Sequence, residues 1–320
     1  MKRTVRRKRP RHNPLHGKDL LSIADLSGDN IKRIFRIALD MKAHPRKYRK
    51  ALEGKIMALI FEKPSLRTRT TFDVGIKQLG GDSVYLSPQE INLGKRESIH
   101  DVAKNLERMV DGVMIRTFGH DVCTSFAEHS AIPVINGLTD FEHPCQALAD
   151  FLTIHECKKR VTGLKVSYVG DGNNVVHSLM LAAARLGARF CAATPGSYAP
   201  DRDVVARAQE IAQETGANIV VQTDPVEAAA NADVIYTDTW TSMGQEKEAE
   251  QRRQVFRPYQ VNRELFSRAK PDALFMHCLP AHRGEEVVDE IIDSPNSVVF
   301  QEAENRLHVQ KAVMLELLGD

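Results

Sequence analysis

The chain has 320 residues, of which 42% are hydrophobic and 27% are charged, and its formal net charge at pH 7 is +2. This length exceeds that of a usual single domain, and the apolar share is ordinary for a soluble protein, so two domains are expected. No apolar run approaches the roughly 18 residues of a membrane span, and no signal-peptide core follows the basic start, so we expect a cytosolic protein without a membrane anchor. Five scattered cysteines without a CxxC pair argue against a disulfide framework and a zinc knuckle.

The first segment, residues 1–17, is basic, and we expect it to be a disordered tail. Its opening, MKRTVRRKRPRH, holds seven Lys or Arg and no acid, so the remainder of the chain is net acidic. Such a segment could bind nucleic acid or an acidic surface, and it also resembles an organelle transit peptide, although it lacks serine. A solvated terminus is the simpler interpretation, so we expect neither a catalytic role nor a nucleic-acid partner.

Hydrophobic periodicity then predicts helices and strands in alternation. A first helix follows a Ser27 cap in SGDNIKRIFRIALDMKAH. In the next part of the chain we expect strands at 55–61, 82–86, 111–116 and 131–135, and helices at 66–79, 98–109 and 119–130. A long helix is expected next, over 143–159. It is followed by strands expected at 164–170, 189–194, 218–223, 233–238, 273–278 and 297–301. A last helix is expected over 303–318.

This alternation predicts an α/β protein with two doubly wound parallel-sheet domains joined by interdomain helices. We expect the domains to be 18–150 and 151–302, with a C-terminal helix over 303–320 that packs back on the first domain. In doubly wound sheets, ligands bind at the carboxyl ends of the strands. Residues that carry chemistry should therefore follow directly after strands.

The first such place is the junction of the strand KIMALIF and the helix SLRTRTTFDVGIKQLG. Ser65 to Arg69 fall in the first helical turn, where free N–H groups and the helix dipole favour an anion. The hydroxyls of Ser65 and Thr68 and the two arginines add donors, which suits a phosphate better than a carboxylate. The alternative is a solvated, capped helix start.

Three more polar residues, Arg116, His143 and Gln146, also follow strands. Individually, His143 could cap a helix and Gln146 could lie on the surface. Together, an arginine, an imidazole donor and a carboxamide beside a phosphate site suit a substrate that carries an amide-like carbonyl next to its phosphate.

The second half of the chain offers three candidate sites. Gly170-x-Gly172-x-x-Val175 is a partial dinucleotide fingerprint, but it lacks the third glycine and no acidic ribose-binding residue follows the next strand, so it is weak support for a nucleotide-dependent oxidoreductase. In TDTWTSMGQE, Asp238 could pair with an ammonium and Ser242 could meet a carboxylate, as in an amino acid. Cys278 follows a strand in FMHCLPAHRGEEV, although it could also be a buried structural thiol.

These motifs together resemble those of the ornithine carbamoyltransferases, from about residue 18 onward. The family pattern Ser-Thr-Arg-Thr-Arg corresponds to residues 65–69, with Leu66 in place of the commoner threonine. His-Pro-Cys-Gln corresponds to 143–146, and the family's Asp-x-x-x-Ser-Met-Gly to 238–244. HCLP at 277–280 and EAENR at 302–306 complete the set.

The resemblance implies a role for each of these residues. Those expected to bind carbamoyl phosphate are Ser65, Leu66, Arg67, Thr68, Asn92, Arg116, His143, Gln146, Leu279 and Arg306. Those expected to bind ornithine are Asn174, Asp238, Ser242, Met243 and Cys278, and the catalytic roles fall to Arg116, His143, Cys278 and Arg306. No metal and no cofactor are implied. A homotrimer, or a multiple of trimers, is implied, in which the loop SPQEINLGKRES with Asn92 reaches the neighbouring subunit's site; several members have Gln or His at the Asn92 position.

The implied reaction is attack of the neutral δ-amine of ornithine on carbamoyl phosphate, which gives citrulline and phosphate, a step of arginine metabolism. The alternative is a carbamoyltransferase that acts on N-acylornithine, putrescine or aspartate. Asp238 argues against the first and last of these, because it suits a free ammonium and repels a second carboxylate, whereas putrescine would leave Ser242 and Met243 with no carboxylate to bind. An alkylammonium titrates near 10.4, so we expect the rate to rise with pH above neutrality.

Overall fold

The computed structural model of the chain describes residues 13–319. Most of the expected tail therefore lies outside the described residues. Its last part, 13–17, lies against the C-terminal helix: the Gly17 N–H donates to the Leu317 carbonyl, and Leu15 is buried. No helix among residues 13–319 is long and apolar enough to cross a membrane.

The first domain is built on a four-stranded parallel sheet in the order β2-β1-β3-β4. Its strands are β1 (Ile56–Phe61), β2 (Asp82–Leu86), β3 (Gly112–Arg116) and β4 (Val134–Leu138). Its helices are α1 (Gly28–Ala43), α2 (Leu66–Gln78), α3 (Pro88–Ile91), α4 (Ile99–Leu106) and α5 (His120–His129). Alternate residues of β1 enter different cores: Met57 and Leu59 join the core under α1 and α2, whereas Ala58 and Ile60 join the core under α4 and α5.

The second domain is a five-stranded parallel sheet in the order β7-β6-β5-β8-β9. Its strands are β5 (Lys165–Val169), β6 (Arg189–Ala193), β7 (Asn218–Gln222), β8 (Val234–Thr237) and β9 (Leu274–His277). Its helices are α7 (Asn174–Leu186), α8 (Arg202–Thr215), α9 (Pro225–Ala229), α10 (Ala249–Phe256), α11 (Arg263–Phe266) and α12 (Asp289–Ile292). The predicted α/β class with two doubly wound parallel sheets is confirmed.

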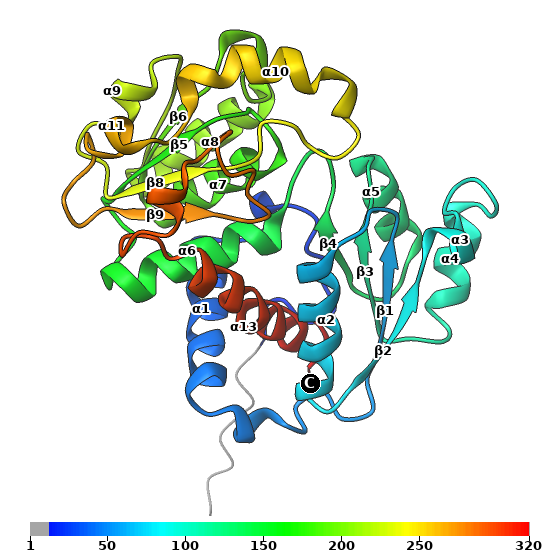
Figure 1. Cartoon of the computed structure of the whole chain (residues 1–320). Coiled ribbons are helices and arrows are strands. Elements are labelled where there is room, and N and C mark those ends of the chain that lie inside the picture. Colours follow the sequence, from blue (N-terminus) through cyan, green and yellow to red (C-terminus); the bar gives the residue numbers. More distant parts are fainter. Residues whose placement is uncertain (1–12, 320) are drawn as a thin grey trace, which may run out of the picture.

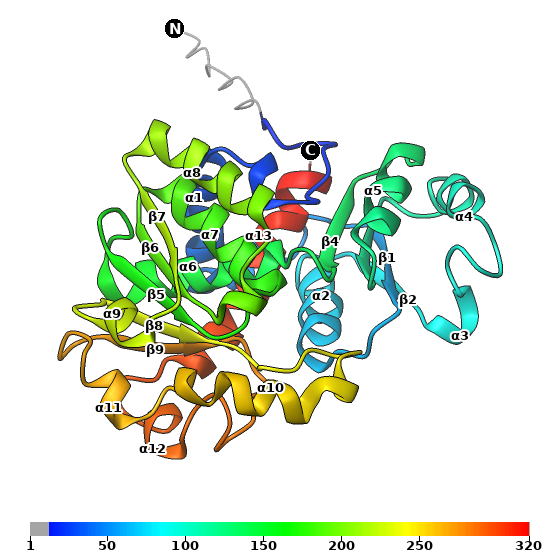
Figure 2. The same ribbon diagram turned by 90° about the horizontal axis from the view of Figure 1, so that it is seen from above.

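Two helices, α6 (Pro144–Lys158) and α13 (Val299–Leu318), lie between the sheets (Figures 1 and 2). α6 leaves the first sheet and packs against α7 of the second domain, whereas α13 packs against α6, α1 and α2 and reaches β9. Because α13 begins beside the second sheet and ends against the first domain, it places side chains from the end of the chain between the two domains.

Two predicted strands differ from the structure. The prediction of a strand at 297–301 is wrong: Ser297 makes a single bridge to Phe275, and α13 begins two residues later. The β-branched run there favours a strand locally, but helical hydrogen bonding begins with Glu302 N–H to the Val298 carbonyl, and helix packing overrides the local propensity. The strand expected at 131–135 is β4 at 134–138. It continues beyond Asn136, where the sequence suggested a loop, because Asn136 and Leu138 pair with β3.

Candidate active site

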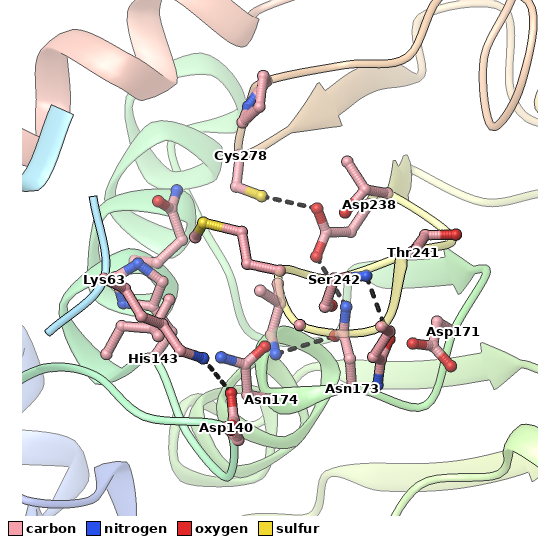
Figure 3. A pocket seen from close by; sticks show the side chains of 18 of the residues that line it. Lys63, Asp140, His143, Asp171, Asn173, Asn174, Asp238, Thr241, Ser242 and Cys278 are labelled. Atoms are coloured by element: carbon pink, nitrogen blue, oxygen red, sulfur yellow. Dashed lines mark hydrogen bonds and ion pairs between the residues drawn. The ribbon is translucent and has the colours of Figure 1, made fainter. Parts of the chain in front are cut away.

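A single cavity of about 960 Å³ contains all the residues to which the resemblance assigns a role, except Asn92 (Figure 3). Arg69 also lies outside it, with its guanidinium 3.7 Å from the centre of the Tyr85 ring, so of the two arginines at the start of α2 only Arg67 faces the cavity. It lies where the carboxyl ends of strands from both sheets face each other, as expected for doubly wound domains. Its predicted lining residues are Ser65, Leu66, Arg67, Thr68, Arg116, His143, Gln146, Asn174, Asp238, Ser242, Met243, Cys278, Leu279 and Arg306. Asn92 lies outside the cavity, at the end of α3, with a left-handed φ of 43°.

The start of α2 forms one wall of the cavity. Ser65 is the N-cap, with its Oγ accepting the Thr68 N–H at 3.2 Å, so the remaining first-turn N–H groups are free to bind an anion. The side chain of Leu66 is 77% exposed and forms none of the hydrogen bonds there. A leucine side chain has no hydrogen-bonding group, so only the backbone N–H of Leu66 could donate to an anion here.

Arginines surround the Thr68 hydroxyl. Arg306 donates to Thr68 Oγ1 at 2.9 Å and to Gln146 Oε1 at 2.6 Å, and Arg116 approaches Thr68 Oγ1 at 3.5 Å. Burial, together with the charges of Arg306 and Arg67, lowers the pKa of Arg116 to about 10. Within residues 13–319, no carboxylate forms an ion pair with any of these three arginines. The cluster therefore holds an excess of positive charge that an anionic ligand would neutralise.

His143 lies beside this cluster at the start of α6. Its backbone N–H donates to Ser178 Oγ at 2.9 Å, and the buried Nδ1 of its ring has no partner among the described residues. Burial, and then the charges of Arg306 and Arg116, keep the pKa of His143 well below its usual 6.5. The imidazole is therefore neutral at physiological pH and can donate one ring N–H to a ligand oxygen.

The opposite wall comes from the ends of β8 and β9. Asp238 accepts from Cys278 Sγ at 3.0 Å and from Asn173 Nδ2 at 2.8 Å (Figure 3). Burial and the Asp238 charge raise the pKa of Cys278 well above 9, so it remains a thiol and is a poor nucleophile. Asn174 donates to the Thr139 carbonyl, which ties α7 to the loop before α6.

Two loops complete the site. In the loop after β8, Ser242 is half-buried and Met243 is 43% exposed, and the Ser242 N–H donates to Gln245 Oε1 at 3.1 Å. After β9, Leu279 has a left-handed φ of 57°, and its carbonyl accepts a hydrogen bond from Arg67. Arg67 thus bridges the two domains across the cavity.

The sequence reasoning missed several lining residues. Lys63 is buried, pairs with Asp140 and lies 4.2 Å from the centre of the Phe118 ring. Its position just after β1 was the available signal. Arg252 of α10 is buried against Asp171, and no local pattern indicated that pair because the partners are far apart in sequence.

Neither a dinucleotide nor a metal fits this cavity well. A Cβ on Gly172 would lie 2.4 Å from the backbone at 198–200, so this glycine serves close chain packing where a pyrophosphate would approach. Ligand atoms of Asp238, His277 and Cys278 lie within 4.8 Å of one another. However, both ring nitrogens of His277 are engaged, by the Leu279 N–H and by Glu286, so a metal would have to displace existing hydrogen bonds.

Comparison with known proteins decides the family. Residues 18–156 match the carbamoyl phosphate-binding domain of the aspartate/ornithine carbamoyltransferases, and residues 162–317 match the Asp/Orn-binding domain of the same proteins. The chain belongs to this family. Within it, an ornithine carbamoyltransferase of Thermococcus kodakarensis is 55% identical over 307 residues, which cover 95% of this chain and 98% of the relative.

A second relative is the anabolic ornithine carbamoyltransferase of Pyrococcus furiosus, 52% identical over 95% of this chain and 98% of its own length. The solved ornithine carbamoyltransferase structure from that organism has a TM-score of 0.93 at 52% identity, with 95% of this chain and 98% of that chain covered. The structure from Thermus thermophilus has a TM-score of 0.85 at 44% identity, covering 94% and 98%. The carbamoyltransferase fold expected from the motifs is therefore confirmed.

Proposed function

We propose that this chain transfers the carbamoyl group of carbamoyl phosphate to the δ-amine of L-ornithine and releases L-citrulline and phosphate. The observation that carries the proposal is a cluster of Arg67 with the buried Arg116 and Arg306, which forms no ion pair with a carboxylate of residues 13–319 and faces the Asp238 carboxylate across one cavity. One wall suits an anion and the other an ammonium, and the ornithine carbamoyltransferases named above are about 50% identical over nearly the whole chain.

Carbamoyl phosphate would bind mainly to the first domain. Its phosphate would take the free N–H groups at the start of α2 and the charges of Arg67 and Arg116. Its carbonyl oxygen would accept hydrogen bonds from His143 and Arg306, and its amide would meet Gln146 Oε1 and the Leu279 carbonyl. As the amine attacks, negative charge grows on the carbonyl oxygen and the departing phosphate, and these fixed donors stabilise it.

Ornithine would bind to the second domain. Asp238 would take its α-ammonium, while Ser242, Met243 and Asn174 would hold its carboxylate end. Cys278 would lie beside the δ-amine as a neutral thiol. The amine must lose its proton before it attacks, and the neighbouring arginines favour that loss by repelling a second positive charge.

Three finer proposals accompany this one. We place the protein in the cytoplasm and in arginine biosynthesis, the latter suggested by the word anabolic in the name of the P. furiosus relative. We propose a homotrimer, or a multiple of trimers, in which the loop around Asn92 completes a neighbouring subunit's site. The location of Asn92 outside its own subunit's cavity supports this arrangement.

The decisive experiment measures carbamoyl transfer from carbamoyl phosphate to L-ornithine, N-acetylornithine, putrescine and aspartate under the same conditions. We expect turnover with ornithine and little with the other three. A preference for another acceptor would still support carbamoyl phosphate binding at the arginine cluster, but it would overturn the roles of Asp238 and Ser242. Absence of transfer to every acceptor would overturn the proposed function.

A further inference from the structure

Two buried acids that the proposed mechanism does not use lie behind Gln146. Asp150 is one helical turn further along α6, and Glu302 belongs to the first turn of α13; both side chains are fully buried. Gln146 Nε2 donates to Asp150 Oδ1 at 2.7 Å and lies 3.3 Å from Glu302 Oε1. The Tyr236 hydroxyl lies 3.2 Å from Asp150 Oδ2 and 3.3 Å from Glu302 Oε1.

We propose that Asp150 and Glu302 share one proton and act as a positioning pair, whose single negative charge orients and polarises the Gln146 amide toward the carbamoyl group. This inference rests on the proposed function, because it assigns the pair a task in carbamoyl phosphate binding.

The surroundings of the pair disfavour two negative charges, whereas the donors that face it stabilise one. Within the described part of the chain, neither carboxylate has an ion-pair partner, so two negative charges here would be buried and unneutralised. The donors that face the pair are the Gln146 amide, the Tyr236 hydroxyl and the backbone N–H of His277. This last group donates to Glu302 Oε2 at 3.1 Å. Burial raises the pKa of both acids, and Asp150 raises that of Glu302 further.

The arrangement also fixes which way Gln146 points. An amide oxygen directed at the pair would face acceptors, so the amide directs its NH2 to the acids and its oxygen to Arg306, at 2.6 Å. The Gln146 amide therefore lies between two opposite charges: its NH2 group faces the anionic pair, and its oxygen faces the Arg306 guanidinium. Negative charge at the NH2 end makes Gln146 Oε1 a stronger acceptor for the NH2 group of carbamoyl phosphate.

Charge-neutral variants test this inference. In Asp150→Asn or Glu302→Gln, the remaining acid can ionise and keep one negative charge, so we expect kcat/KM for carbamoyl phosphate to fall by less than about tenfold. The double variant cannot carry the charge, so we expect a loss of at least about 100-fold, well beyond the product of the single losses, mostly through the KM of carbamoyl phosphate. Glu304→Gln, on the exposed face of the same helix, is the matched control and should behave as the wild type. Equal or additive losses would overturn the inference.

A second measurement does not depend on the double variant folding. Infrared spectra of the substrate-free protein at pH 8, in H2O and D2O, should show the C=O stretch of one more protonated carboxyl in the wild type than in either single variant. An unchanged band would overturn the shared proton. The proposed function fails separately, if the wild type forms no citrulline, and that outcome leaves the infrared test intact.

Discussion

The two walls of the cavity are built differently. The wall expected to hold carbamoyl phosphate is buried and bonded: Thr68, Arg116, His143, Gln146 and Arg306 are all buried, and Arg306 joins two of the others by hydrogen bonds. In the wall expected to hold ornithine, Asp238 accepts a hydrogen bond from Cys278, but the loop that follows it is open, and Met243 there is 43% exposed. The difference indicates that one half of the site is formed before ligand binds, whereas the other is completed by it.

This contrast leads us to expect an order of binding. A preformed cluster of positive charge attracts its anion without reorganisation, so carbamoyl phosphate should bind first. The loop after β8 has few hydrogen bonds to the rest of the cavity, and closing it over ornithine would exclude water from the reacting groups.

The largest effect should come from the preformed wall. Arg306→Leu removes the donor that joins Thr68 and Gln146, and the loss of one such charged donor corresponds to about 3 to 4 kcal/mol of transition-state stabilisation, roughly 100-fold to 1,000-fold in rate. Steady-state kinetics with varied carbamoyl phosphate measures it. Arg202→Leu, on the exposed start of α8, is the control and should leave the rate unchanged. A loss below tenfold with Arg306→Leu would mean that the anion does not bind this cluster.

A smaller and selective effect should come from the other wall. Asp238→Asn keeps the shape of the side chain but removes the charge that pairs with an ammonium, so we expect kcat/KM for ornithine to fall about tenfold to 100-fold. The KM for carbamoyl phosphate should remain the same. Measuring both constants in one variant tests whether the two walls are separate, because an equal change in both would show that they are not.

The dependence of the rate on pH should reflect both walls. Raising the pH from 6 to 8 should increase kcat/KM by up to about tenfold per unit, because more ornithine amine is neutral. His143 should add no inflection there, since its pKa is held well below 6.5 and it stays neutral. A flat profile between pH 6 and 9 would contradict attack by the free amine.

The smallest effect should follow Leu66→Thr. Leu66 is 77% exposed, and we expect it to bind the anion only through its backbone N–H, so a threonine hydroxyl at this position should change the KM for carbamoyl phosphate by less than about twofold. Thermal unfolding measured at increasing carbamoyl phosphate concentrations compares the affinity of the variant and the wild type for this ligand without turnover. Tighter binding by tenfold or more would show that the side chain reaches the phosphate.

The sequence predicted the position of Ser65 to Thr68 for a physical reason. These residues are contiguous, and a strand followed by a capped helix fixes where they lie without knowledge of distant contacts. The Arg252–Asp171 pair could not be predicted because its environment depends on packing between remote segments. The prediction of a strand at 297–301 was wrong for the same reason, because the start of α13 depends on packing against segments that are distant in sequence. Lys63, in contrast, was missed although its position just after β1 offered a signal.

The course of α13 has a consequence for how such proteins can be recombined. By sequence, this helix falls within the second family domain, residues 162–317, yet it packs against α1 and α2 and gives Arg306 to the anion wall. A chimaera that exchanged the second domain at the domain boundary would therefore also replace a donor and a packing surface of the first. Exchanging either domain alone would separate α13 from the surface of α1 and α2 against which it packs.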